Sequence, residues 1–271
     1  MSKTTELGLP ALGQIHHYVV AGDFHSEHVD EKSLNCLIQY GLTLKRKLPK
    51  NDDYALIING DFLDVEHLMF KGGTFKGLYK AKAFEELSQL SLDEYMLGNS
   101  MLDRLQKAYP NIFFISGNHE VRAKEFLAHY ECPIAYQHNF EIEKGLHLKK
   151  RGIPHYDYND FLKIGNHLIT HGIWCGASAL NKHHAVAGGH NIIYNHVHNT
   201  ESKSYANKDG VVHAHANGTM ADLGPHYIKN RPVPWSNAFI SLHVQPTGHG
   251  TVYNHEIVNG KLLLPTGEIL G

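Results

Sequence analysis

The chain has 271 residues, of which 42% are hydrophobic and 19% are charged, proportions typical of a globular protein. No run of about 18 apolar residues is present, so we expect no membrane-spanning helix and no membrane partner. Lys and Arg number 25 against 27 Asp and Glu, which excludes the global positive field that marks many nucleic-acid-binding proteins. Finding no linker-like stretch, we predict a single domain over residues 1–271.

The N-terminal residues 1–6 are polar and lack the basic start and apolar segment of a secretory signal, so we expect a cytoplasmic protein. Cys36, Cys132 and Cys175 are too few and too far apart for a disulfide framework or a thiolate zinc site, and we expect buried free thiols. The 23 histidines favour metal chemistry, although they also make His-x-His pairs frequent by chance.

Five apolar runs predict buried strands, and each ends in Asp, Asn or His. In chain order they are residues 16–21 before Asp23 and His25, residues 54–59 before Asp61, residues 112–115 before Asn118, residues 166–170 before His171, and residues 191–195 before His196 and His198. Ligands of α/β proteins bind outside the carboxyl ends of the strands, so we expect these side chains to gather in one site.

The other segments are less uniform. Helical periodicity predicts helices over residues 31–47, 80–108, 120–130 and 176–187, with a break at Gly98-Asn99 in the second. Residues 1–14 show no pattern, and residues 133–165 show short strand-like pieces. From residue 211 onwards the chain is predicted to be rich in strands, with a hairpin at Asn259-Gly260.

Residues 66–80 interleave Phe70, Phe75 and Tyr79 with lysines around glycines. Such a loop could stack bases and contact phosphates. It could equally be a surface loop whose aromatic side chains pack back onto the protein. His213 and His215 are expected on one strand face, and His183-His184 on a helix surface.

The donors at the five strand ends are carboxylate, amide and imidazole groups without thiolates, a set suited to Mn, Fe, Zn or Ni. Seven donors are too many for one ion. They suit two divalent ions about 3.5 to 4 Å apart that clamp the attacking and leaving oxygens of an in-line displacement. Phosphoester hydrolysis is the natural chemistry of such a pair.

The order Asp-x-His, Gly-Asp-x-x-Asp, Gly-Asn-His-Glu, a lone His and His-x-His, over residues 22–198, resembles the calcineurin-like metallophosphoesterase superfamily. The resemblance implies an α/β fold, a four-layer α/β/β/α sandwich of two mixed sheets flanked by helices. The last motif usually begins with Gly, whereas this chain has Asn195, which is less permissive at a strand end.

The resemblance also divides the seven donors between two divalent metal ions, most simply Mn: Asp23, His25 and His198 for one, Asn118, His171 and His196 for the other, and Asp61 as the bridge. His119 is then free to bind the scissile phosphate or to protonate the leaving oxygen, while Asp64 orients its ring. Glu120 is expected to cap the following helix, and Arg122 is a candidate substrate contact.

Three functions fit this pattern. The first is a phosphodiesterase or nuclease that acts on DNA, RNA or nucleotides through in-line attack by a hydroxide held between the metals. The second is a Ser/Thr-type protein phosphatase, whose second motif normally continues Asp-Arg-Gly where this chain has Asp64-Val65-Glu66. Because that arginine is missing, we rank the first function above the second. The third is a non-enzymatic interaction protein stabilised by metal.

Overall fold

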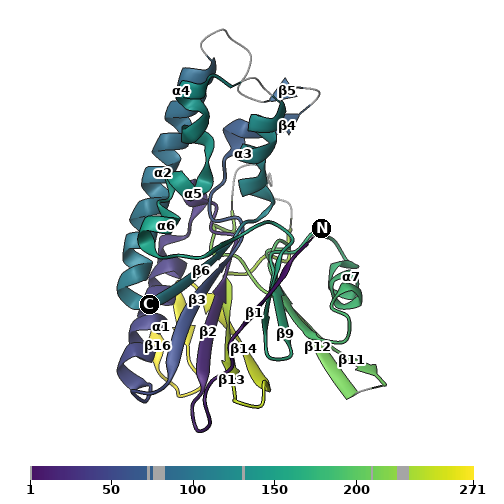
Figure 1. The fold of residues 1–271 in the computed structure, drawn as a ribbon. Helices are drawn as coiled ribbons and strands as arrows, with labels where there is room; N and C mark the ends of the chain where they lie inside the picture. Colours follow the sequence, from purple (N-terminus) through teal and green to yellow (C-terminus); the bar gives the residue numbers. More distant parts are fainter. Residues whose placement is uncertain (1, 72–73, 76–82, 130–131, 209, 225–231) are drawn as a thin grey trace.

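A computed structural model describes residues 2–271 apart from 72–73, 76–82, 130–131, 209 and 225–231 (Figure 1). Most described residues belong to two β-sheets and the helices that cover them. No described helix is both long enough and apolar enough to cross a membrane.

The larger sheet joins a parallel half to an antiparallel half. Along the described part of this sheet, the order is β16-β15-β14-β13-β2-β3-β6-β7. The strands are β2 (His16–Ala21), β3 (Asp53–Asn59), β6 (Asn111–Ile115), β7 (His155–Tyr156), β13 (Ala238–Val244), β14 (Gly250–Val258), β15 (Lys261–Leu263) and β16 (Ile269–Leu270). Strands β2, β3, β6 and β7 run parallel, so β2, β3 and β6 end at the same edge.

The second sheet is also mixed, and its described strands follow the order β1-β8-β9-β10-β12-β11. They are β1 (Thr4–Leu7), β8 (Phe161–Ile164), β9 (His167–Thr170), β10 (Asn191–Tyr194), β11 (Glu201–Asn207) and β12 (Gly210–Ala216). Strands β9 and β10 are parallel, with Thr170 opposite Tyr194. The residues after these two strands are therefore neighbours.

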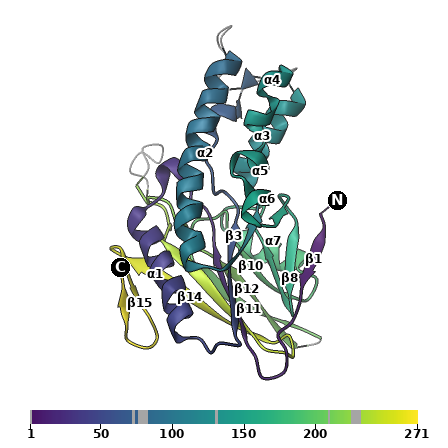
Figure 2. The same ribbon diagram turned by 60° about the vertical axis from the view of Figure 1, so that its left-hand side comes forward.

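The two sheets pack face to face, with helices on both outer faces (Figures 1 and 2). Val20 and Ile57 of the larger sheet share one buried cluster with Ile169 and Ile193 of the smaller sheet. The alternate residues of β2 and β3, such as Val19, face the helices instead, as the period of two along a strand requires. The predicted four-layer sandwich is confirmed.

Helices α1 (Glu31–Lys47) and α2 (Ala83–Ala108) cover the outer face of the larger sheet, and α7 (Ala179–Val186) covers that of the smaller. Asp30 caps the N-terminus of helix α1, where its side chain accepts a hydrogen bond from the Ser33 N–H at 3.0 Å. The remaining described helices are α3 (Asn118–His129), α4 (Ile134–Gln137), α5 (Ile142–Gly145), α6 (Leu148–Arg151), and the single turns η1 (Ser26–His28), η2 (Glu66–Leu68) and η3 (His138–Phe140).

Several expectations about local structure were wrong. Helix α2 runs through Gly98 without a break, because this glycine allows close packing: a Cβ there would lie 2.7 Å from the Leu146 side chain. The segment 133–165 contains the short strands β7 and β8, as expected, but also the helical turns α4, η3, α5 and α6, which were not. The unpatterned lead-in contains β1. Cys175 is exposed, unlike Cys36 and Cys132.

Of the two expectations about neighbouring histidines, one is confirmed and the other is wrong for His183. His213 and His215 lie on β12 as predicted, where Ser204 and Ser202 contact their rings. His183 is 1% exposed rather than on a helix surface, because its Nε2 accepts a hydrogen bond from the Ile173 N–H.

Two short strands form in the aromatic and lysine-rich loop at residues 66–80. Residues Phe70–Lys71 and Thr74–Phe75 pair as β4 and β5. Tyr79 and the aromatic side chains of this loop lie outside the described residues, so base stacking by this loop stays a prediction.

Candidate metal centre

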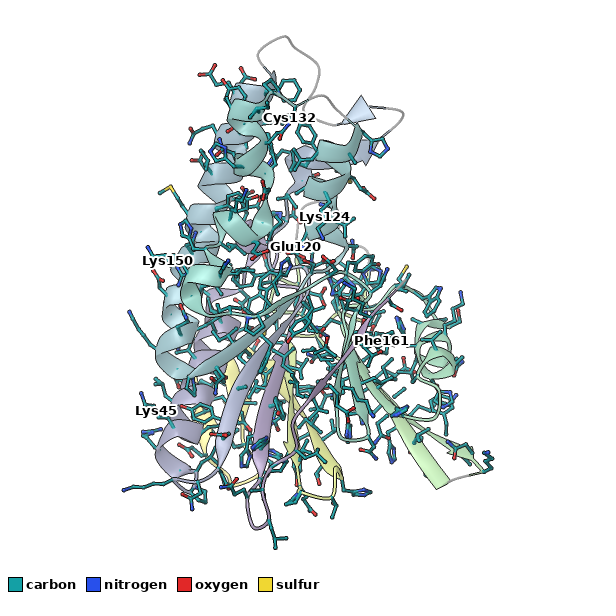
Figure 3. All side chains as sticks on the ribbon, in the orientation of Figure 1. Lys45, Glu120, Lys124, Cys132, Lys150 and Phe161 are labelled. Carbon is teal, nitrogen blue, oxygen red and sulfur yellow. The ribbon has the colours of Figure 1, made fainter. Side chains whose placement is uncertain are left out.

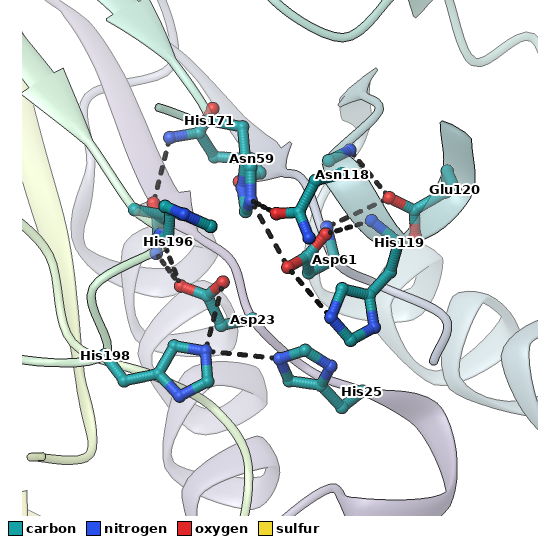
Figure 4. Close-up of polar contacts among 12 residues, drawn as sticks. Asp23, His25, Asn59, Asp61, Asn118, His119, Glu120, His171, His196 and His198 are labelled. Carbon is teal, nitrogen blue, oxygen red and sulfur yellow. Dashed lines mark hydrogen bonds and ion pairs between the residues drawn. The ribbon is translucent and has the colours of Figure 1, made fainter. Parts of the chain in front are cut away.

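The carboxyl ends of five strands from both sheets meet at one place, and the predicted donors lie there (Figure 4). Strands β2, β3 and β6 deliver theirs from the larger sheet, and β9 and β10 from the smaller. The brought-together donors are Asp23, His25, Asp61, Asn118, His171, His196 and His198. The convergence follows from the parallel pairing within each sheet.

Five of these residues have backbone angles that side chains rarely adopt. Their φ values are positive: Asp23 54°, His25 47°, Asp61 48°, His196 75° and His198 59°. Such left-handed residues cost on the order of 1–3 kcal/mol each and cluster at functional sites. Their concentration here indicates that the turns after the strands are shaped to direct these side chains rather than to minimise strain.

The first group of donors joins the two sheets. Asp23, His25 and His198 place one ligand atom each within 4.8 Å of one another. The Nε2 atoms of His25 and His198 are 3.2 Å apart. Asp23 Oδ2 accepts a hydrogen bond from the His196 N–H at 3.0 Å, whereas its buried Oδ1 has no hydrogen-bond partner and lies 3.5 Å from His198 Nε2.

The second group lies beside the first. Asp61, His171 and His196 place one ligand atom each within 4.8 Å of one another. His171 Nε2 lies 3.3 Å from Asp61 Oδ2 and 3.1 Å from Asn118 Oδ1. Its Nδ1 is 2.8 Å from the Asn59 carbonyl, which accepts its proton and leaves Nε2 directed into the site.

The charges of the second group influence each other strongly. Burial alone would raise the pKa of Asp61, but the His171 and His119 imidazoles hold this pKa well below its ordinary value. Burial would lower the pKa of His171, but the Asp61 and Asp23 carboxylates raise it to about 10. In the metal-free protein Asp61 and His171 therefore form a buried ion pair, which is the charge arrangement that a bound cation would replace.

His119 has a different set of neighbours. Its Nδ1 lies 2.9 Å from Asp64 Oδ1, while Arg122 donates to its Nε2 at 2.9 Å and to the Asp64 carbonyl at 2.6 Å. The same Asp64 Oδ1 lies 3.1 Å from Nδ1 of His25. One carboxylate thus orients two imidazoles, with Nε2 of each ring turned into the site.

Glu120 is 1% exposed and connects two of the strand ends (Figures 3 and 4). It accepts a hydrogen bond from the Gly117 N–H, which is the helix cap that we predicted. It also accepts from the backbone N–H groups of Asp61 and Leu63 at 3.0 and 2.8 Å. Burial and the Asp61 charge raise the pKa of Glu120 to about 7.

Glu94 of α2 is a second buried carboxylate that the sequence analysis missed. It accepts hydrogen bonds from Ser26 Oγ at 2.6 Å and from the Val65 and Asp64 N–H groups. It therefore fixes the loops that carry His25 and Asp64. A signal was present, because Leu87, Glu94 and Met101 share one heptad position on a helix whose other two members are buried and apolar.

Asn195 stands where the motif usually has Gly, and it does not disturb the turn. Its φ is not positive, and its buried side chain links both sheets. It donates to Asp23 Oδ2 at 3.2 Å and to the Gly218 carbonyl at 3.1 Å, and it accepts from Asn59 at 2.9 Å. The space opposite it is available because residue 22 is glycine, whose Cβ would lie 2.8 Å from Asn195.

The chemistry of the clustered side chains fits a metal site. Carboxylate and imidazole donors converge, an unpartnered carboxylate oxygen of Asp23 is buried among them, and two imidazole Nε2 atoms face each other at 3.2 Å. A proton shared by the two nitrogens leaves the carboxylate oxygen of Asp23 without a partner. A cation bound by all three groups would satisfy both nitrogens and that oxygen together.

Comparison with known proteins places the chain among phosphoesterases. No curated protein matches the sequence. Among solved structures, Vps29 of Chaetomium thermophilum is 10% identical, with a TM-score of 0.44 over 94% of each chain. TT1561 of Thermus thermophilus is 9% identical, with a TM-score of 0.35 over 89% of this chain and 99% of the other. The family model described as calcineurin-like phosphoesterase matches residues 16–238, and the chain belongs to that family.

Proposed function

We propose that the protein is a phosphoester hydrolase with a dinuclear metal centre, acting as a phosphodiesterase. The observation that carries this proposal is the presence of two adjacent donor groups, one made of Asp23, His25 and His198 and the other of Asp61, His171 and His196. Asp23, His25 and His198 would hold one divalent ion. Asn118, His171 and His196 would hold the other, with Asp61 between them. Such ions, when bound, supply Lewis-acid activation of water and neutralise phosphate charge.

His119 would serve the substrate rather than a metal. Although His25, Asp61 and His119 form a third compact donor group, both ring nitrogens of His119 already have partners. The Arg122 guanidinium donates to Nε2, so the proton of the neutral ring lies on Nδ1 and is donated to Asp64. A cation cannot share that Nε2 lone pair with a guanidinium.

Arg122 and His119 would then act on the phosphate together. A phosphate oxygen near the guanidinium would take over the hydrogen bonds that Arg122 now makes to His119 and the Asp64 carbonyl. His119 Nε2, no longer bonded to the guanidinium, would take up a proton from solvent and give it to the leaving oxygen as the bond from phosphorus breaks. Asp64 keeps the ring in place through Nδ1.

The first prediction concerns His119. With Mn(II), we expect the protein to hydrolyse bis(p-nitrophenyl) phosphate, and His119→Ala to lower kcat by about 10² to 10⁴-fold, the usual contribution of a general acid. Bound manganese, measured by elemental analysis after gel filtration, should be unchanged in this variant. Full activity of His119→Ala, or loss of one metal per chain, would contradict the assigned role.

The second prediction concerns Asp61, the proposed bridge. Asp61→Asn keeps the shape of the side chain but removes its charge, so we expect weaker metal binding as well as lower activity. Titration with Mn(II), followed by calorimetry, should show at least about a tenfold rise in Kd, as for loss of a charged metal contact. An unchanged Kd would remove Asp61 from the metal site.

The substrate class is tested by a panel assayed under identical conditions: single-stranded DNA, duplex DNA, RNA, cyclic nucleotides and a phosphopeptide. We expect diesters to be cleaved in preference to the phosphopeptide. One supporting feature is that Val65, where phosphatases carry arginine, is fully buried and offers the phosphate no contact. Cleavage of the phosphopeptide alone would favour the protein phosphatase function instead.

A further inference from the structure

A cavity of about 540 Å³ opens directly beside the metal centre. His196 and His198, two of the proposed ligands, form part of its wall, so a group held in the cavity lies next to the reacting phosphate. Its wall also includes Cys175 in the loop after β9, Tyr194 at the end of β10, Asn199 and Glu201 beyond it, and Pro234 and Trp235 before β13.

Trp235 is fixed relative to the centre. Its ring centroid lies 4.7 Å from that of His198. The adjacent Ser236 donates its N–H to the His198 carbonyl at 2.9 Å, and its carbonyl accepts from Thr219 at 2.9 Å. Ser236 Oγ also contacts the Thr200 N–H at 3.2 Å. The backbone that carries the indole is thus hydrogen-bonded to His198 of the cavity wall and held by Thr200 and Thr219, which is the preorganisation that a stacking platform needs.

The remaining described wall is apolar apart from a few uncharged polar groups and the carboxylate of Glu201. Tyr194 is 1% exposed and stacks on His183 with ring centroids 3.8 Å apart. Asn199 and Glu201 add hydrogen-bonding groups, of which the exposed Glu201 carboxylate can only accept. The described lining contains no Lys or Arg. A cavity with a stacking surface and an acceptor, but without cations, suits a flat heterocycle bearing N–H donors rather than a further phosphate.

We infer that this cavity binds the nucleobase of a mononucleotide ester, whose phosphate lies at the metal centre and whose base stacks on Trp235. The inference rests on the proposed phosphoesterase function and narrows it. Polynucleotides place charged phosphates on both sides of each nucleoside, and the lining residues that the structure describes offer them no cation. A phosphopeptide has no aromatic base beside its phosphate. The preferred substrate is therefore a small nucleotide diester.

The test compares two ligands that share a phosphate but differ in the base, AMP and ribose 5-phosphate. Calorimetry with the Mn(II)-loaded protein should give AMP at least about a tenfold lower Kd, as expected for one stacked base. Trp235→Ala should reduce this ratio to near one while leaving the Kd of ribose 5-phosphate unchanged. Trp235→Leu, which keeps apolar volume without an aromatic face, should do the same and guards against misfolding of the alanine variant.

The second tryptophan supplies the control. Trp174 lies against His183 and is not among the lining residues, so Trp174→Phe should keep the preference for AMP. This variant has Trp235 as its one tryptophan, and adenosine should quench its fluorescence. Adenosine should not quench Trp235→Phe. Adenosine carries no phosphate, so this readout needs neither metal nor catalysis.

The outcomes separate the two proposals. Equal affinity for AMP and ribose 5-phosphate, or a ratio unchanged in both Trp235 variants, would overturn the base site while hydrolysis of bis(p-nitrophenyl) phosphate stands. If AMP is preferred through Trp235 but no ester is hydrolysed, the base site stands and the enzymatic function fails.

Discussion

Single buried carboxylates hold the loops of the candidate site. Glu94 and Glu120 are 2% and 1% exposed, and each accepts from backbone N–H groups of the loop after β3. The donors at the strand ends could be predicted because each follows an apolar run in the sequence. The heptad position of Glu94 marks it as buried, but the sequence does not show which loops it binds. Trp235 could not be predicted, since it reaches the site from a distant loop, and contacts of that kind leave no local pattern.

Glu94→Gln tests this positioning role. The amide NH₂ cannot accept, so one of the donors Ser26, Asp64 or Val65 loses its partner in a buried place. We expect unfolding in urea to show a loss of about 1–3 kcal/mol. We also expect kcat for bis(p-nitrophenyl) phosphate to fall more than KM changes, because Asp64 is displaced. Glu86→Gln, at an exposed position of the same helix, is the matched control. An unchanged kcat at unchanged metal content would leave Glu94 with a purely structural role.

At the scale of elements, apolar residues that recur every two or every 3.6 positions correctly predicted the strands and helices whose apolar faces are buried. Strand β11 was missed because its residues are largely exposed and polar, so its pairing with β12 leaves no hydrophobic pattern. The break predicted at Gly98 was wrong because a local signal was overridden by packing. Glycine has low helix propensity, but tertiary packing against Leu146 decides the conformation there.

Helix α1 offers a similar case for experiment. Gly41 lies in its middle, where a Cβ would come within 2.6 Å of the Tyr109 ring, and the Tyr109 hydroxyl donates to the Leu37 carbonyl at 2.7 Å. Propensity alone predicts that Gly41→Ala stabilises the helix by about 1 kcal/mol. We expect instead a net loss of about 1–3 kcal/mol, because the rigid, buried ring must shift.

Urea unfolding of Gly41→Ala measures this loss directly. Leu42→Ala, at the neighbouring and 39% exposed position, should change the free energy of unfolding by much less. A gain in stability for Gly41→Ala would mean that the Tyr109 ring moves without cost and that propensity decides.

At the scale of the whole molecule, the site depends on two sheets whose parallel strands end at the same edge of the sandwich. The sequence predicted that the five strand ends meet, because parallel strands bring their carboxyl ends together. It could not predict which residues connect the sheets. The sheets are connected by the hydrogen bond between Asn59 and Asn195 and by Asn217, which donates to the Val20 carbonyl at 2.9 Å. Their pairing becomes visible only when both sheets are present.

Buried histidines spread through both sheets give the fold a defined response to acid. His167 on β9 and His255 on β14 are 2% and 5% exposed. Burial lowers the pKa of each from 6.5 to about 4, with neighbouring histidines adding to the effect at His167. Between pH 6.5 and 4 the unfolded chain takes up protons that the folded chain does not. The stability contributed by these two neutral imidazoles is therefore fully present above pH 6.5 and is lost as the pH drops through this window.

Urea unfolding in the presence of a chelator, which removes the pH dependence of metal binding, should show this fall. Each such histidine adds a slope of at most about 1.4 kcal/mol per pH unit. His255→Gln, whose side chain can still hydrogen-bond to Ser241, should have a shallower slope than the wild type by up to that amount. His138→Gln, at an exposed position, should keep the wild-type slope. If His255→Gln keeps the wild-type slope between pH 6.5 and 4, His255 is protonated in the folded protein, and the sheet must tolerate positive charge in its interior.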